Sequence, residues 1–235
     1  MKSALNMTAF NDLPKNTPLS NIVPFNADED KLLLLDFTSN NTSLTDEILE
    51  DISAFSLYVK TLLANAGAKY GIGGYNENRT VYDRSKVFNT DDEPRRLHIG
   101  LDIWGETGTP VFAPLPGQIH SFAYNDQFGD YGATIILQHH VNNITFHTLY
   151  GHLSLKDLNG LYKGKPVVQG QQIATFGDLY ENGQWPPHLH FQIIMDMEGM
   201  KGDYPGVCKS RESGKYLSNC PDPDIILDMM KFAIE

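Results

Sequence analysis

Two short stretches, far apart in the chain, place histidine and aspartate at alternate positions among apolar residues. One stretch, over 97–103, carries His98 and Asp102, and the other, over 188–193, carries His188 and His190. Successive side chains of a β-strand point to opposite faces, so each stretch is predicted to be a strand with one apolar and one polar face. The polar faces offer imidazole and carboxylate groups, which are zinc ligands.

Bringing the two polar faces together would place His98, Asp102 and His190 around one ion. Two neutral imidazoles and one carboxylate make a three-ligand zinc site with an open fourth position for water, which is typical of a catalytic rather than a structural site. Gly100 stands between the first two ligands, where a side chain would crowd the metal. The alternative is that these histidines face solvent without a chemical role, and the matching parity of the two stretches disfavours it.

Three motifs resemble the lysostaphin-type (LytM-like) zinc metallopeptidase family. They are H-x-x-x-D at 98–102, Y-G-H-L-S at 150–154 and H-L-H at 188–190, in this order. The resemblance covers roughly 95–195. It implies a zinc-dependent endopeptidase that hydrolyses peptide or amide bonds of peptidoglycan-type peptides or fragments.

By position, the resemblance implies His98, Asp102 and His190 as the zinc ligands and His152 and His188 as the catalytic pair. Zinc lowers the pKa of its water to about 7, and imidazoles titrate near neutral pH, which suits them as base and acid. His188 shares the strand and face of His190, so the pleat should place it beside the metal rather than on it. For His152 the alternative is a surface histidine at a strand end.

A glycine-rich stretch, 72–79, precedes these motifs and contains three candidates for substrate binding. Tyr75, Asn76 and Arg79 offer polar groups for a substrate carboxylate or amide, and arginine presents a fork to a carboxylate. The alternative is an ordinary glycine-rich turn. In many lysostaphin-type proenzymes an upstream asparagine blocks the zinc, and the resemblance makes Asn76 or Asn78 a candidate for that role.

The chain departs from the family pattern just before the first metal histidine. Many lysostaphin-type enzymes carry a tyrosine there, which is thought to stabilise the oxyanion, and 89–97 contains none. Arg95, Arg96 and Tyr82 are the candidates to replace it. The departure leaves the oxyanion contact and the substrate open.

The spacing of short apolar runs predicts a mainly β fold. From Leu97 onward, runs of β-type residues alternate with Gly, Pro and Asn turns, and a G-x-P-V sequence recurs at 108–111 and 164–167. This pattern suits an antiparallel β-sheet or sandwich of the duplicated hybrid motif type, with an N-terminal helix and a short C-terminal helix. Asn142-Asn143 is a candidate hairpin turn.

Three parts of the chain are expected. In 1–94, residues 1–30 form a loose arm, Lys31–Phe37 a strand, and apolar positions from Ile48 to Ala66 a helix that stops at Gly67 and packs on the core. In 95–200 lies the zinc metallopeptidase-like β domain. In 201–235, a polar loop precedes a short helix over 224–233.

Composition limits the partners of this 235-residue chain. A formal net charge of −11 argues against nucleic acid and anionic cell-wall polymers as primary partners, because both require clustered Lys and Arg. The expected partner is a peptide or peptidoglycan-fragment substrate, and no oligomeric state is implied. Two cysteines do not make a disulfide framework, and Cys208 and Cys220 are predicted to be free thiols.

No stretch has the apolar run of a signal peptide or a membrane span, so the chain as given is expected to be cytoplasmic. A true start upstream of Met1 would instead allow an extracytoplasmic enzyme, which is the usual setting of the family.

Two other function classes remain open. A catalytically inactive peptidoglycan-binding or activator module of the same fold would be expected to lose ligands, whereas all three are present here. A phosphohistidine or biotinyl carrier would not require Asp102, and no biotinyl-lysine motif occurs.

Overall fold

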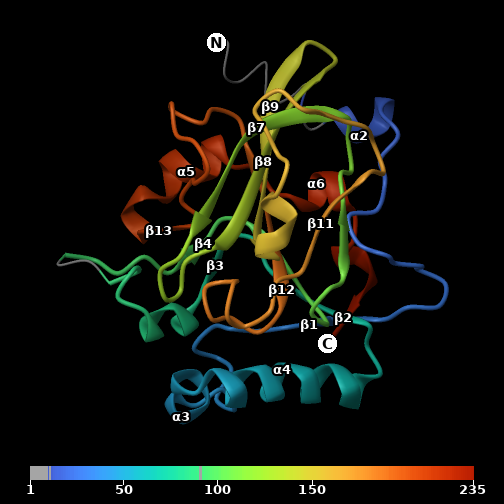
Figure 1. The fold of residues 1–235 in the computed structure, drawn as a ribbon. Helices are drawn as coiled ribbons and strands as arrows, with labels where there is room; N and C mark the ends of the chain where they lie inside the picture. Colours follow the sequence, from blue (N-terminus) through green and yellow to red (C-terminus); the bar gives the residue numbers. More distant parts are fainter. Residues whose placement is uncertain (1–9, 11, 90–91) are drawn as a thin grey trace.

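The computed structural model describes residues 10, 12–89 and 92–235. Within them the largest sheet has nine strands, in the order β10-β7-β8-β9-β12-β5-β2-β1-β14 (Figure 1). These strands are β10 (Pro166–Val167), β7 (Gly117–Asn125), β8 (Gly132–Val141), β9 (Ile144–Leu153), β12 (His188–Ile194), β5 (Leu101–Trp104), β2 (Tyr70–Gly73), β1 (Leu32–Leu34) and β14 (Ala233–Ile234). The predicted mainly β fold is therefore confirmed.

The large sheet is antiparallel from β10 to β2, as predicted, but its last strands are parallel. Both β2 and β14 pair parallel with β1, so segments near the two ends of the chain share one edge of the sheet. Within the antiparallel part, the long hairpin β8–β9 closes through Asn142 and Asn143, with φ values of 51° and 64°. This left-handed pair is the turn that an Asn-Asn dipeptide favours.

Two smaller sheets flank the large one. β6 (Pro110–Phe112) pairs with β11 (Gln172–Thr175), and β4 (Leu97–His98) lies between β3 (Glu77–Asn78) and β13 (Val207–Cys208). The single strand predicted over 97–103 is therefore divided between β4 and β5, with a bend at Gly100. A Cβ at Gly100 would lie 2.3 Å from His190 Cε1, so a side chain there would crowd the ring of this predicted ligand.

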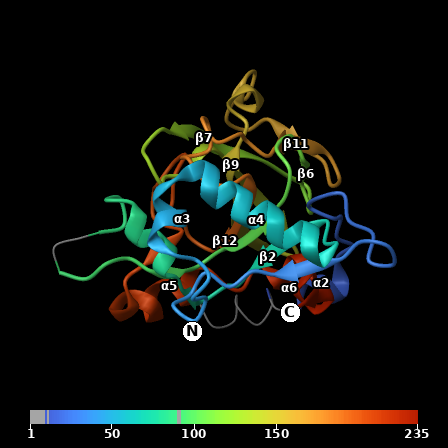
Figure 2. The ribbon, with the colours of Figure 1, turned by 90° about the horizontal axis from the view of Figure 1, so that it is seen from below.

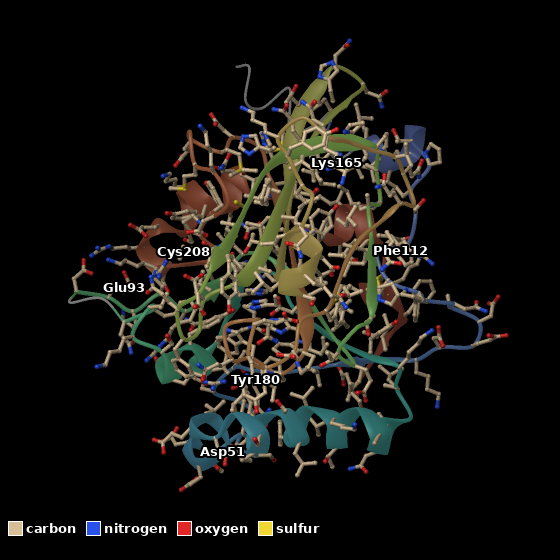
Figure 3. All side chains as sticks on the ribbon, in the orientation of Figure 1. Asp51, Glu93, Phe112, Lys165, Tyr180 and Cys208 are labelled. Carbon is tan, nitrogen blue, oxygen red and sulfur yellow. The ribbon has the colours of Figure 1, made fainter. Side chains whose placement is uncertain are left out.

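The N-terminal helix differs from prediction because it is broken at Asp51. The chain forms α3 (Asp46–Glu50) and then α4 (Ile52–Ala66), and Figure 3 labels Asp51 at their junction. Asp51 is extended, and its carboxylate accepts hydrogen bonds from the backbone N–H groups of Ser53 (2.8 Å) and Ala54 (3.2 Å). It is therefore the N-cap of α4. The predicted stop at Gly67 is confirmed by its φ of 59°.

Helix α4 covers one side of the molecule next to the centre of the sheet (Figures 1 and 2). Its buried residues Phe55 and Val59 belong to an aromatic cluster with Trp104 and Trp185. The rings of Phe55 and each of these tryptophans lie 6.4 Å apart between centroids. The predicted packing of this helix on the core is observed. No helix in the described ranges is long and apolar enough to cross a membrane.

The N-terminal arm and the C-terminal region are more ordered than predicted. Phe10, Leu13, Ile22 and Val23 are all buried in the main core, so the described part of 1–30 is not a loose arm. The predicted helix over 224–233 is instead a short helix, a 3-10 turn and β14. The remaining short elements are α2 (Leu13–Asn16), η1 (Thr80–Arg84), η2 (Leu155–Leu158), η3 (Ser210–Glu212), α5 (Ser213–Asn219), α6 (Asp224–Leu227) and η4 (Met230–Phe232).

Candidate metal centre

The pairing of β12 with β5 sets His190 directly opposite Asp102, and β4 brings His98 to the same point. His190 Nδ1 lies 3.0 Å from His98 Nε2 and 3.0 Å from Asp102 Oδ1, and the remaining side of this triangle is 3.3 Å. The three residues are 0–3% exposed. Among the described residues, they are the group of His, Cys, Asp or Glu side chains that could hold one metal ion.

Hydrogen bonds to the ligand rings orient their lone pairs toward the centre of this triangle. The carbonyl oxygen of Gly74 can only accept, so His98 Nδ1–H donates to it at 3.0 Å and leaves Nε2 unprotonated. Gln192 donates through its amide nitrogen to the Pro205 carbonyl oxygen, so its Oε1 faces His190 and accepts from Nε2–H at 3.0 Å. His190 Nδ1 is then also unprotonated.

This donor set fits a zinc ion. Two imidazole lone pairs that face each other at 3.0 Å repel unless a cation lies between them. Tetrahedral zinc with bonds of about 2.0–2.1 Å has neighbouring ligand atoms about 3.3 Å apart, close to the observed separations. In each imidazole the nitrogen that faces away from the triangle donates a hydrogen bond, to Gly74 or to Gln192. Metal-binding histidines are usually oriented by such a bond.

The electrostatics of the ligands favour their metal-binding protonation states. Burial, together with the nearby Arg79 charge, lowers the pKa of His98 to about 4, so its ring is neutral near pH 7. Burial opposes ionisation of Asp102, but His98, Arg79 and the hydrogen bonds to its carboxylate hold its pKa well below the usual range. At neutral pH the site therefore presents the neutral imidazole of His98 and the ionised carboxylate of Asp102.

His152 and His188 lie together beside the ligands. Their ring centroids are 4.0 Å apart, and the His152 ring lies 6.3 Å from that of His190. Each Nδ1–H donates to a backbone carbonyl oxygen, to Asn182 at 2.7 Å and to Pro186 at 2.8 Å respectively. Both Nε2 atoms are therefore proton acceptors. Burial lowers the pKa of His188 to about 4 and that of His152 well below its usual value.

His152 has an uncommon backbone conformation for a non-glycine residue. It follows the regular part of the hairpin at the end of β9 and has a φ of 61°. Its backbone is fixed on both sides, because its N–H donates to the Tyr131 carbonyl oxygen (2.8 Å) and its own carbonyl accepts from Gly177 N–H (2.9 Å). Such left-handed residues cost of order 1–3 kcal/mol and concentrate at functional sites.

A cavity of about 120 Å³ opens beside these groups, and its walls include Asp102, His152, His188 and His190. Five aromatic residues also line it, namely Tyr82, Phe88, Trp104, Tyr131 and Trp185. A peptide in this cavity would therefore meet aromatic rings next to the histidines, as in the stack of Trp104 on His188.

The three residues predicted to bind substrate occupy different positions. Tyr75 Oη donates to the Cys220 carbonyl oxygen at 2.5 Å, and Asn76, with a φ of 57°, donates its backbone N–H to the His98 carbonyl oxygen at 2.9 Å. Neither they nor Asn78 line the cavity. Arg79 does line it, and its guanidinium forms ion pairs with Asp102 and Glu77.

The candidates for the oxyanion contact are also separated. Tyr82 and Arg95 line the cavity, whereas Arg96 forms an ion pair with Asp83 at 2.6 Å and does not. The Tyr82 hydroxyl lies 3.4 Å from Arg79 Nη1. Of the three, Tyr82 has its side chain buried next to the ligands, with its ring 6.4 Å from that of His98.

Several residues that support the site were not predicted from the sequence. Trp104 stacks on His188. It follows Asp102 by two residues on the same strand, so strand alternation would have placed it on the same face as this predicted ligand. The carbonyl groups of Gly74, Asn182 and Pro186 have no sequence signal, because any residue type supplies one.

The other four histidines do not belong to the candidate metal group. His120 and His147 contact each other, with ring centroids 4.9 Å apart, and His140 is exposed. His139 is buried, and both its ring nitrogens have hydrogen-bond partners, Pro116 and Thr148.

Comparisons with known proteins find similarity to peptidases. Residues 96–201 match the model of Peptidase family M23. Peptidoglycan DD-endopeptidase ShyC of Vibrio cholerae serotype O1 is 29% identical over 127 residues, which are 50% of this chain and 27% of that protein. DD-carboxypeptidase/endopeptidase Mpg of Neisseria meningitidis serogroup B is 32% identical over 126 residues, 51% of this chain and 26% of that protein.

Among solved structures, the catalytic domain of the antimicrobial peptidase lysostaphin from Staphylococcus simulans is similar at 26% identity, with a TM-score of 0.35. The similarity covers 51% of this chain and 80% of that domain. The chain spans about a quarter of the length of each of these two curated relatives.

Proposed function

Since residues 96–201 of this chain belong to peptidase family M23, we propose that the chain is a zinc-dependent hydrolase of peptide or amide bonds. The observation that carries this proposal is the triangle of His98 Nε2, Asp102 Oδ1 and His190 Nδ1, with sides of 3.0–3.3 Å. Two unprotonated nitrogens and a carboxylate oxygen at these separations form a three-ligand site for zinc.

When bound, zinc supplies a Lewis acid for the substrate carbonyl and an acidified water for attack. The chain's own groups hold and move the protons. His152 Nε2 and His188 Nε2 are both unprotonated at neutral pH, so either can accept a proton from the attacking water and return it to the leaving amine. Their Nδ1–H bonds to backbone carbonyls keep the rings oriented for this transfer.

The proposed substrates are peptidoglycan-type peptides or their fragments. The two relatives are named a peptidoglycan DD-endopeptidase and a DD-carboxypeptidase/endopeptidase. These names support the substrate class and do not identify one scissile bond. The aromatic residues that line the cavity favour a peptide held by apolar contact, and the net charge of −11 disfavours a polyanionic partner.

Zinc content and cleavage of a panel of purified muropeptides test the proposal together. We expect about one zinc per chain after dialysis and release of new amino groups from at least one muropeptide. Asp102→Ala should lose both properties. Zinc-loaded protein that binds muropeptides without cleaving any of them would instead identify an inactive binding or activator module. Protein that retains no zinc would refute the assignment of the ligands.

A further inference from the structure

The segment Ile72–Arg79 precedes the part of the chain that matches the family, yet it contacts two of the proposed ligands. We propose that this segment completes the metal centre, with Arg79 as the residue that makes Asp102 bind metal through one oxygen only. The inference rests on the proposed function and assigns the glycine-rich motif a role in positioning the ligands rather than in binding substrate.

The two carboxylate oxygens of Asp102 have different partners. Oδ1 faces the proposed metal position, at 3.0 Å from His190 Nδ1 and 3.3 Å from His98 Nε2. Oδ2 points away from it and accepts a hydrogen bond from Arg79 Nη1. The guanidinium competes with a metal for Oδ2 and for no other oxygen of Asp102, so coordination through Oδ1 alone is favoured and the fourth position is left for water.

Arg79 is fixed in this position on every side. Its side chain is 1% exposed, and its Nε donates to Glu77 Oε2 at 2.5 Å. Gly73 leaves the space that the guanidinium fills, because a Cβ there would lie 2.7 Å from Arg79 Nη2. A buried guanidinium with two carboxylate partners keeps its charge, and it supplies the counter-charge that buried Asp102 requires.

The same segment orients His98. Gly74 provides the carbonyl oxygen that accepts from His98 Nδ1–H at 3.0 Å, and Asn76 donates its backbone N–H to the His98 carbonyl oxygen at 2.9 Å. β3 extends this contact, with Glu77 directly opposite His98. One short segment therefore holds both the ring of one ligand and the carboxylate of another.

These contacts leave Arg79 without a pair of free N–H groups that could bind a substrate carboxylate. Nε is bonded to Glu77, Nη1 to Asp102 and Tyr82, and Nη2 is 3.5 Å from the Gly74 carbonyl oxygen. A substrate carboxylate would have to displace buried partners of opposite charge. The geometry therefore favours an action on Asp102, although Arg79 also lines the cavity.

A positive charge near the metal has two opposing effects. It repels the cation, and it holds the ligand carboxylate in its binding geometry. Loss of a hydrogen-bond partner behind a metal ligand typically weakens metal binding 10- to 100-fold, so we expect positioning to dominate.

The test compares Arg79→Gln and Arg79→Lys with the wild-type protein by chelator competition for zinc and by the absorption spectrum of the cobalt(II)-substituted protein. We expect 10- to 100-fold weaker zinc binding in both variants. The cobalt spectrum of Arg79→Gln should lose intensity, because Asp102 can then bind through two oxygens and raise the coordination number. A cooperative melt of each metal-free variant shows that the fold is retained.

The matched control is Arg211→Gln. Arg211 also pairs with two carboxylates, Asp92 and Glu93, but it lies outside the cavity and is 55% exposed. This control should bind zinc as the wild-type protein does. If Arg79→Gln does not fold, Glu77→Gln replaces it, since that change frees Arg79 Nε and should produce a weaker loss of the same kind.

The outcomes separate the inference from the proposed function. Wild-type protein that binds no metal would refute both. Wild-type protein that binds zinc, with affinity and cobalt spectrum unchanged or with higher affinity in the Arg79 variants, would refute the positioning role alone. Lower melting temperatures without a change in zinc affinity would show that Arg79 only stabilises the fold, and would refute it as well.

Discussion

His188 and Trp104 stack face to face, with ring centroids 3.9 Å apart and ring planes inclined by 13°. They are direct partners in the register between β12 and β5. His188 Nδ1–H also donates to the Pro186 carbonyl oxygen. An indole therefore fixes one face of the imidazole and a carbonyl group fixes one edge, which gives His188 Nε2 a defined direction.

Replacing Trp104 separates its packing role from its effect on His188. Trp104→Ala should lower the free energy of unfolding by about 3–5 kcal/mol, because a large buried ring is lost from the cluster with Phe37 and Phe55. Trp104→Phe keeps an aromatic face on His188 and should retain most of the activity. Urea unfolding and kcat on one cleavable muropeptide measure the two effects. Equal stability of wild type and Trp104→Ala would contradict the packing argument.

Alanine at His152 or His188 should slow catalysis and leave zinc in place. General acid–base groups typically contribute about 100- to 10,000-fold, so kcat/KM should fall by that factor in each single variant. The two groups act on the same water and leaving amine, so the double variant should lose less than the product of the single losses. Zinc content and kcat/KM of the three variants are the measurements. Loss of zinc in His188→Ala would mean that it, and not His190, is the ligand.

Both cysteines should be free and slow to react in the folded protein. Cys208 and Cys220 are buried and unpaired, and burial raises their pKa values to about 11 and about 12. Thiolate is the reactive form, so a thiol reagent at pH 8 should modify neither residue quickly. Two thiols per chain should react after unfolding without reductant. Fewer than two would indicate oxidation of this pair.

The grouping of the three candidate ligands was predictable from sequence because strand parity is a local property. His98, Asp102 and His190 share their parity with the polar faces of their strands, and the pairing of Asp102 with His190 then follows from packing the apolar faces in one core. The break at Asp51 was not predictable in this way. An aspartate near a helix start is equally suited to the first turn and to the N-cap, and the tertiary position of α4 selects the cap.

The contact of Arg79 with Asp102 could not be deduced from sequence for a different reason. Asp102 is 23 residues away from Arg79 in the sequence. An arginine can pair equally well with the carboxylate of a substrate or with a carboxylate of its own chain, so the residue type does not identify the partner. Only the fold shows that Glu77 and Gly73 enclose the guanidinium. The burial of Phe10 and Ile22 was missed similarly, because isolated apolar residues in a polar segment have no periodicity.

The metal-free protein should lose stability as the pH falls from about 6.5 to about 4. Burial depresses the pKa values of His98, His139, His147 and His188 to about 4 in the folded state, whereas the unfolded chain binds protons near 6.5. Their contribution is therefore fully present above pH 6.5 and is lost as the pH falls. Each such histidine contributes a slope of about 1.4 kcal/mol per pH unit. Urea unfolding at several pH values, with chelator present, should show this fall, and constant stability would contradict it.

The left-handed backbone of His152 gives a prediction about strain. His152→Ala and His152→Gly both remove the imidazole, but only glycine adopts a φ of 61° without a steric cost. His152→Gly should therefore be more stable than His152→Ala by about 1 kcal/mol, whereas both should be equally slow in catalysis. Urea unfolding of the two variants measures the difference.

The control for this comparison is His140, which is exposed on β8 of the same hairpin and is not among the residues with positive φ. There the order should be reversed, with His140→Gly less stable than His140→Ala by about 0.5–1 kcal/mol, because glycine loses more conformational freedom in a strand. If glycine were also the less stable residue at 152, the backbone would not be strained there. The position of His152 would then depend only on its hydrogen bonds to Tyr131, Gly177 and Asn182.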